Sequence, residues 1–183
     1  MIKNKKDLKQ FLLKDNENYI KKSSKEKMRI WMLNDHQKSI RKFLKLLRYE
    51  EFYFNTADNI FKKLISMYYE NRRNTLGNKI GIYICHNCFD SGLVIDHYGN
   101  IIVNGYARIG KNCRLHGDNC IGNNGFTKEA PIIGDNVNIG IGAKIIGNVY
   151  IADNIIIGAN AVVTKSFYEK GITIAGVPAE KIK

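Results

Sequence analysis

The chain has 183 residues, of which 44% are hydrophobic and 25% are charged, and its formal net charge is +12. No run of 18 apolar residues occurs and no apolar stretch follows the charged start, so a membrane-spanning or secreted protein is not expected. We therefore expect a cytoplasmic location. The lone Cys85–Cys88 CxxC pair lacks the second pair of ligands that a zinc site needs, and no metal is predicted.

The positive charge is concentrated in residues 1–79, which contain 20 Lys and Arg and 9 Asp and Glu, whereas residues 80–183 contain 9 and 8. A basic region can indicate a nucleic-acid partner. Here the basic residues are spread along helical segments that carry no nucleic-acid-binding motif. We interpret them as a solvated face and predict no nucleic-acid partner. An anionic substrate, or weak association with an anionic membrane surface, remains the alternative.

The N-terminal region is predicted to be α-helical. Ser23 and Glu26 have the spacing of a capping box and begin a longer helical stretch. A further helix is expected to begin at Asn55 or Thr56 and to stop at Gly77, since glycine commonly ends helices. We expect the apolar residues of these helices to pack against each other or against a second subunit.

From residue 80 the composition shifts toward Gly, Ile, Val and Asn, and we place a domain boundary between residues 1–79 and 80–183. Large aliphatic residues then return every six residues, interrupted only at Thr127. The slots are Val103, Ile109, Leu115, Ile121, Ile133, Ile139, Ile145, Ile151, Ile157 and Val163.

This period fits neither an α-helix nor an ordinary strand, and it predicts a parallel β-helix whose coils bury their apolar faces by stacking. Three six-residue sides make one coil, so residues 18 apart should lie above one another, about 4.8 Å apart. Glycines that follow the aliphatic slots are expected to let the chain turn at the corners.

Three segments of this region resemble the hexapeptide-repeat acyltransferases, a left-handed β-helix family that includes serine acetyltransferase and many sugar O-acetyltransferases. They are Ile139–Gly147, Ile157–Lys165 and Ala175–Ala179. The resemblance covers roughly the C-terminal 100 residues. It implies a mainly β, left-handed parallel β-helix behind an N-terminal α-helical segment, with acetyl-CoA as co-substrate. Members usually form homotrimers, with the active site between adjacent β-helices.

The segment Leu93–Val103 resembles the part of serine acetyltransferase that bears the catalytic histidine, so His97 matches the base and Asp96 the aspartate beside it. O-acetylation needs a base for the hydroxyl proton, and histidine suits this role because it ordinarily titrates near neutrality. An 18-residue coil would stack His97 on Leu115, close to His116. His116 is then a candidate second base or substrate ligand. Asp96 would orient an imidazole or bind acceptor hydroxyls, or else be a solvated turn residue.

The resemblance also implies a groove for CoA that is lined by backbone groups and small residues. The matching positions are Gly142, Ala143 and Ala161 for the groove, with Thr164 and Lys165 near the nucleotide end. Lys181 would pair with a phosphate, since ammonium groups bind phosphate as point charges.

Two departures from serine acetyltransferase bear on the acceptor. That enzyme has an Arg-His pair before the proline that matches Pro131, where this chain has Glu129 and Ala130 in a shorter loop. The aspartate expected on the coil before His97 also has no clear counterpart. His97-Tyr98-Gly99, followed by His116, resembles instead the serine acetyltransferase-like enzymes of surface-polysaccharide gene sets.

We therefore expect direct acetyl transfer to a hydroxyl of a surface polysaccharide sugar, of capsular or lipopolysaccharide type, or its precursor. Serine O-acetylation in cysteine biosynthesis is the alternative within the same chemistry. From other classes, a non-catalytic β-helix used for assembly remains, whereas the spacing of His86, His97 and His116 does not resemble the histidine pair of a β-helix carbonic anhydrase. The anhydrase would need three histidines around a metal.

Overall fold

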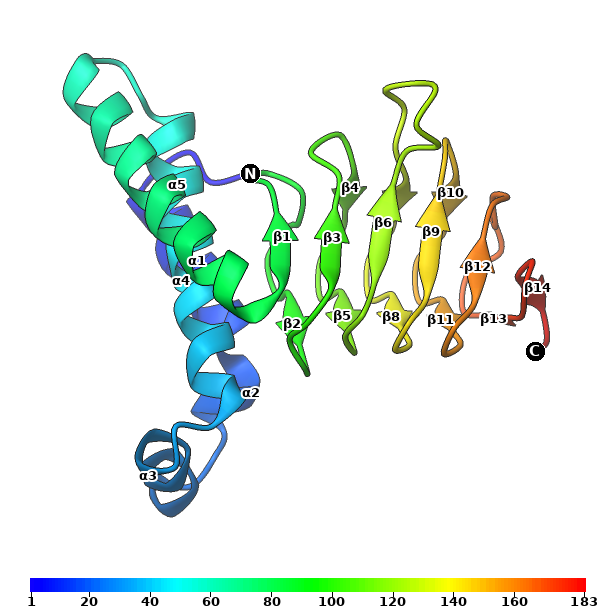
Figure 1. Ribbon diagram of the computed structural model, residues 1–183, viewed down its shortest axis with the longest axis horizontal. Helices are drawn as coiled ribbons and strands as arrows, with labels where there is room; N and C mark the ends of the chain where they lie inside the picture. The colour runs from blue at the N-terminus through cyan, green and yellow to red at the C-terminus, as the bar shows by residue number, and fades with distance from the viewer.

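The computed structural model describes residues 1–183, the side chain of Asn18 excepted, and places a group of helices at one end of a β-helix (Figure 1). The helices are α1 (Lys5–Asp15), α2 (Glu17–Ile20), α3 (Ser24–Met32), α4 (His36–Asn55) and α5 (Ile60–Ile80). Among the described residues, no helix combines the length and apolar character that crossing a membrane requires.

The helix ends confirm one sequence prediction and correct two. Ser23 and Glu26 form the predicted capping box at the start of α3. The helix expected from Asn55 or Thr56 begins later, capped by the side chain of Asn59. Gly77 does not end α5, which continues to Ile80. A Cβ at Gly77 would lie 2.4 Å from the carbonyl oxygen of Ile82, so glycine is required there by the close approach of helix and strand.

The strands of the β-helix form three sheets, and each coil contributes to them in turn. The first sheet contains β1 (Ile82–Ile84), β3 (Ile101–Val103), β6 (Cys120–Gly122), β9 (Lys144–Ile146) and β12 (Val162–Val163). The second contains β4 (Arg108–Ile109), β7 (Ile132–Ile133) and β10 (Tyr150–Ile151). The third contains β2 (Val94–Ile95), β5 (Arg114–Leu115), β8 (Asn138–Ile139), β11 (Ile156–Ile157), β13 (Thr173–Ala175) and β14 (Glu180–Lys181). All pairings are parallel except that of β13 with β14.

The six-residue repeat is confirmed as the source of the core, because all ten aliphatic slots are buried. The predicted spacing of 18 holds where Ile139 pairs with Ile157. It fails one coil earlier, where Leu115 pairs with Ile139, 24 residues away. The six additional residues lie in the loop between β6 and β7, which projects beyond β6 in Figure 1.

The corners differ from the prediction, because glycines after the aliphatic slots do not supply the left-handed conformations. Those belong to glycines at other positions and to asparagines such as Asn112, Asn136 and Asn154, which have positive φ angles and hydrogen-bond to one another through their side chains. Gly140 is needed for space instead. A Cβ there would lie 2.6 Å from the backbone nitrogen of Ala159 on the next coil.

The helices close the open end of the β-helix through α4. Ile40, Phe43, Leu44 and Leu47 are buried and continue the aliphatic core of the coils. By contrast, the predicted apolar residues of α5 are largely exposed. Phe61 is 73% and Leu64 55% exposed, so this helix does not bury its apolar side chains within the single chain.

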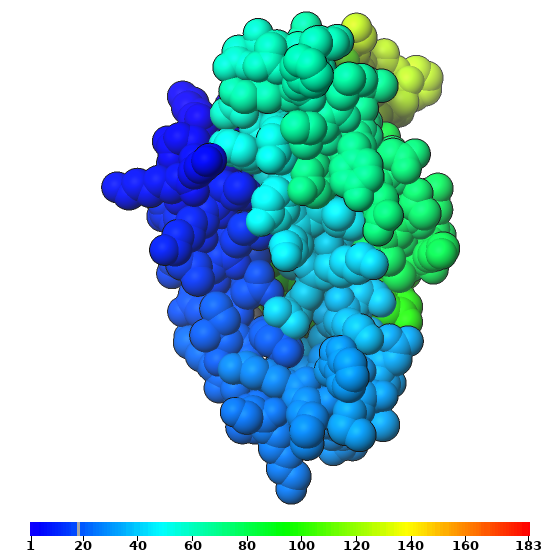
Figure 2. All heavy atoms as spheres, turned by 90° about the vertical axis from the view of Figure 1, so that its left-hand side faces the viewer, coloured from blue at the N-terminus to red at the C-terminus, as the bar shows by residue number. Residues whose placement is uncertain are grey.

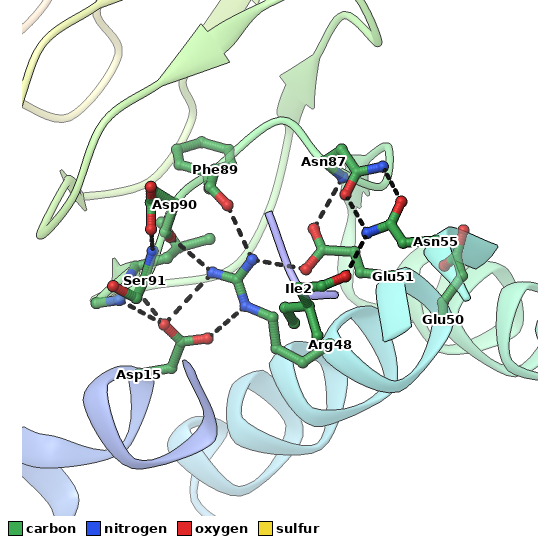
Figure 3. A network of polar contacts seen from close by, with 12 residues as sticks. Ile2, Asp15, Arg48, Glu50, Glu51, Asn55, Asn87, Phe89, Asp90 and Ser91 are labelled. Carbon is green, nitrogen blue, oxygen red and sulfur yellow. Dashed lines mark hydrogen bonds and ion pairs between the residues drawn. The ribbon is translucent and has the colours of Figure 1, made fainter. Parts of the chain in front are cut away.

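A buried ionic network fixes the helices to the first coil (Figure 3). Arg48 is fully buried, and its guanidinium donates to Asp15 at 2.7 Å, to Glu51 at 2.8 Å and to the carbonyl oxygens of Phe89 and Asp90 at 2.9 Å each. Burial by itself lowers the pKa of Arg48, but the carboxylates of Glu51 and Asp15 outweigh it and raise this pKa above its ordinary value. The network therefore joins α1, α4 and the segment that leads to β2.

Candidate active site

The structure places His97 in a corner, and the predicted stacking of His97 on Leu115 is wrong. Ile95 pairs with Leu115, 20 residues later, so the corner that follows Ile95 contains two additional residues. His97 consequently lies above Gly117, where a Cβ added to the glycine would lie 3.4 Å from the Cβ of His97. His116 remains the neighbour of this corner, as the sequence predicted, because it is level with Asp96.

Asp96 and His116 form one polar cluster on the outer face of three coils. Arg114 donates to both carboxylate oxygens of Asp96, at 2.8 and 3.0 Å, and these bonds raise the pKa of Arg114. The Nδ1 atom of His116 lies 3.1 Å from Asp96 Oδ2, and its Nε2 lies 2.7 Å from Oδ1 of Asn138. Both nitrogens of the His116 ring therefore already have partners. Asp96 orients an imidazole, but that imidazole belongs to His116.

His97 is exposed, and among the described residues no hydrogen bond to its ring is found. Its imidazole stacks on that of His36, with ring centroids 5.2 Å apart and an angle of 27° between the planes. Tyr98, the next residue, meets His36 edge-on. The freer ring of His97 is the better placed of the two histidines to accept a proton from a substrate.

Two residues that sequence reasoning missed support this corner. His36, the first residue of α4, has its Nε2 atom 3.0 Å from the carbonyl oxygen of Asp96. Because a carbonyl only accepts, Nε2 of His36 must carry the hydrogen. Asn119 is fully buried; its side chain accepts from the Gly117 N–H at 3.0 Å and donates to the Gly140 carbonyl at 2.7 Å. Neither residue lies in a sequence motif, and the only signal for Asn119 is a polar residue at an inward-facing position.

The residues predicted to bind CoA lie on later coils of the β-helix than His97, beginning with Gly142, whose N–H donates to the Gly117 carbonyl at 3.0 Å. Ala143 and Ala161 lie on neighbouring coils, and both side chains point into the core, so only their backbone groups could line a groove. Gly142 occupies the corner beside Asn160. Thr164 is exposed.

Both lysines predicted to meet CoA phosphates are engaged with carboxylates. Lys165 lies 2.6 Å from Glu180, and Lys181 lies 2.7 Å from Glu169. All four side chains are about half exposed or more. Exposed ion pairs contribute little free energy, so a phosphate could replace either carboxylate at small cost.

The protein contains a match to the bacterial transferase hexapeptide family, six repeats, over residues 130–165. The serine acetyltransferase of Staphylococcus xylosus is 39% identical over 93 residues, which are 50% of this chain and 43% of that protein. This chain is therefore similar to bacterial hexapeptide transferases and to serine acetyltransferases. It spans less than half of the length of the curated relatives that it matches.

Solved structures extend the likeness in fold to the helices of this chain. Soybean serine acetyltransferase without ligand matches 97% of the chain and 69% of its own length, with a TM-score of 0.74 and 20% identity, which supports the fold alone. A serine acetyltransferase in complex with CoA matches 79% of the chain and 57% of its own length, with a TM-score of 0.63 and 25% identity. The left-handed β-helix with an N-terminal helical segment is thereby confirmed.

Proposed function

We propose that this protein is an acetyl-CoA-dependent O-acetyltransferase in which His97 is the general base. The observation that carries the proposal is the exposed imidazole of His97, without a hydrogen-bonding partner among the described residues, beside the Asp96–His116 cluster on a hexapeptide β-helix. The relatives' names and the solved complex of a serine acetyltransferase with CoA support acetyl-CoA as the donor.

The reaction needs one proton acceptor and no acyl-enzyme. His97 takes the proton of the acceptor hydroxyl as its oxygen attacks the thioester carbonyl of acetyl-CoA. The tetrahedral oxyanion would be stabilised by a backbone N–H of a coil corner. When the intermediate collapses, the carbon–sulfur bond breaks and the imidazolium of His97 returns the proton to the sulfur of CoA. His116, held by Asp96 and Asn138, would position the acceptor.

For CoA, we keep the predicted groove with two changes. Gly142, Ala143 and Ala161 would contribute backbone groups only, because both alanine side chains are buried. Lys165 and Lys181 would exchange their carboxylate partners for phosphate oxygens, and Thr164 would lie beside them. A homotrimer, usual in this family, would place these residues opposite the His97 corner of a neighbouring subunit.

The acceptor favoured by the comparisons is L-serine, because the matched relatives are named serine acetyltransferases. They do not support the polysaccharide sugar that we expected from the sequence. One observation keeps a sugar hydroxyl as the second candidate. The exposed Glu129 and the buried Ala130 stand where the resemblance leads us to expect an Arg-His pair for an amino acid, and neither offers a cation to a carboxylate.

The test measures loss of thioester absorbance from acetyl-CoA with L-serine or with neutral sugars as the acceptor. We expect His97→Ala to lower kcat by about 10²–10⁴-fold, the contribution typical of a general base, with CoA binding unchanged. His86→Ala is the control, since that histidine lies on the first coil and pairs with Glu50. Near-full activity of His97→Ala would refute the assignment of the base. Turnover of sugars but not of L-serine would reverse the order of the two acceptors.

A further inference from the structure

A cavity of about 390 Å³ lies between the N-terminal helices and the strand that leads to the candidate base. Its walls come from the end of α1, the α2 segment and the first turns of α4, and its floor comes from residues 93–96. Figure 2 shows the outer face of these helices, where α1 in dark blue lies beside α4 in light blue and cyan, with the β-helix behind them. The size is within the range of small-molecule sites.

The cavity combines an aliphatic floor with walls that carry hydrogen-bonding groups. Ile40, Leu44 and Leu93 are buried beneath it. The side chains of Tyr19 and Gln37 line it, and no hydrogen bond is found for their polar ends among the described residues. Such a surface suits a ligand that has both carbon–hydrogen faces and polar groups.

The lining of the cavity contains more positively charged than negatively charged side chains. Asp15 and Asp96 are the acidic side chains of the lining, and both already form ion pairs with residues other than Lys22 and Arg41. Asp15 is held by Arg48 and accepts from the backbone N–H groups of Gly92 and Leu93, at 2.7 and 3.0 Å. Asp96 is held by Arg114 and His116. Two lining cations, Lys22 and Arg41, therefore have no carboxylate partner among the described side chains.

Arg41 is fixed in place without being neutralised. Its Nε donates to Oδ1 of Asn16 at 3.0 Å, and its guanidinium carbon lies 3.3 Å from the centre of the Tyr19 ring. Its two terminal nitrogens have no acceptor among the described residues, although each can donate two hydrogen bonds. A guanidinium held in this way offers the planar pair of donors that carboxylates and phosphates bind.

The cavity is continuous with the proposed active site, because Asp96 and Arg114 belong to both. The carbonyl of Asp96 contacts His36, which in turn stacks on His97. We propose that this cavity binds the anionic group of the acceptor, a carboxylate or a phosphate, through Arg41 and Lys22. The inference depends on the proposed acetyl transfer and assigns the recognition of the acceptor to the N-terminal helices.

The test compares the double variant Arg41→Gln and Lys22→Gln with a control, Lys42→Gln and Lys45→Gln, which makes the same charge change on exposed residues outside the cavity. KM is measured for L-serine, glucose 1-phosphate and glucose with acetyl-CoA. A lost charge-assisted hydrogen bond corresponds to about a tenfold change or more. We expect the cavity variant to raise KM at least about tenfold for an anionic acceptor, with kcat unchanged and the control unaffected.

L-serine carries a carboxylate and glucose 1-phosphate carries a phosphate, so the two acceptors distinguish the sources of the charge. The substitutions should raise KM only for the acceptor whose anionic group the cavity binds. An unchanged KM for every anionic acceptor that is turned over would overturn the cavity proposal while leaving acetyl transfer intact. Binding of inorganic phosphate, followed by calorimetry on the full chain, separates the two proposals. If no acceptor is acetylated, but phosphate binds and its affinity is lower only in the cavity variant, the site stands and the proposed function fails. Phosphate binding that is equal in all three proteins would refute the site.

Discussion

Replacing Arg48 by methionine should destabilise the protein far more than replacing an exposed arginine. The substitution keeps the apolar length of the side chain but leaves the carboxylates of Asp15 and Glu51, which are 1% and 2% exposed, without their cation. Removing one partner of a buried ion pair typically costs about 3–5 kcal/mol of unfolding free energy. For a chain of this size that corresponds to a decrease in Tm of roughly 6–20 °C.

The assay is thermal unfolding by circular dichroism at fixed protein concentration, because association of subunits would otherwise shift Tm. Arg72→Met is the matched control: Arg72 is exposed on α5, and its replacement should change the unfolding free energy by no more than about 0.5 kcal/mol. A variant at position 48 that unfolds within about 1 kcal/mol of the parent protein would refute the account of the network in Figure 3.

Three further predictions concern the coils. Gly140→Ala should lower stability in urea by about 1–3 kcal/mol, since its Cβ would lie 2.6 Å from the Ala159 nitrogen, whereas Gly122→Ala, with no atom within 4 Å, should have little effect. Burial raises the pKa of the Cys88 thiol to about 12, so at pH 8 it remains protonated; peptide mapping after iodoacetamide treatment should show it unmodified and the half-buried Cys120 alkylated. Equal labelling of both would contradict this. Lys165→Ala should raise KM for acetyl-CoA about threefold to tenfold without changing KM for the acceptor. An unchanged KM for acetyl-CoA would show that Lys165 does not belong to the CoA site.

The regular part of the fold could be predicted from the sequence because each aliphatic slot carries the same local information. Ile139 and Ile157 stack because every residue between them belongs to an unbroken repeat. The count alone could not fix the register across an insertion. Six additional residues after β6 keep the phase of the repeat, so the sequence cannot show that Leu115 lies above a residue 24 positions later.

The position of His97 shows that counting along the six-residue repeat fails where a corner contains additional residues. The repeat, extended backward from Val103, places His97 at an inward aliphatic position. In the structure Ile95 fills that position, and two additional residues move His97 outward to the corner. The resemblance proposes His97 as the base, and the periodicity misplaced this residue. An imidazole in the core would be a poor base, so under the proposed function the irregular corner gives His97 access to a substrate.

The remaining parts of the candidate site depend on contacts between segments that are distant in the sequence. His36 lies 60 residues before Asp96, and Asp15 lies 77 before Gly92. Such pairs have no spacing that a single sequence can reveal, because they form only when α4 closes the end of the β-helix. Under the proposed function the coils supply the base and the CoA groove, and they can be shared among relatives with different acceptors. The helices place His36 against His97 and Arg41 in the cavity, so we expect differences in acceptor between such proteins to arise in the helices as well as in the loop before Pro131.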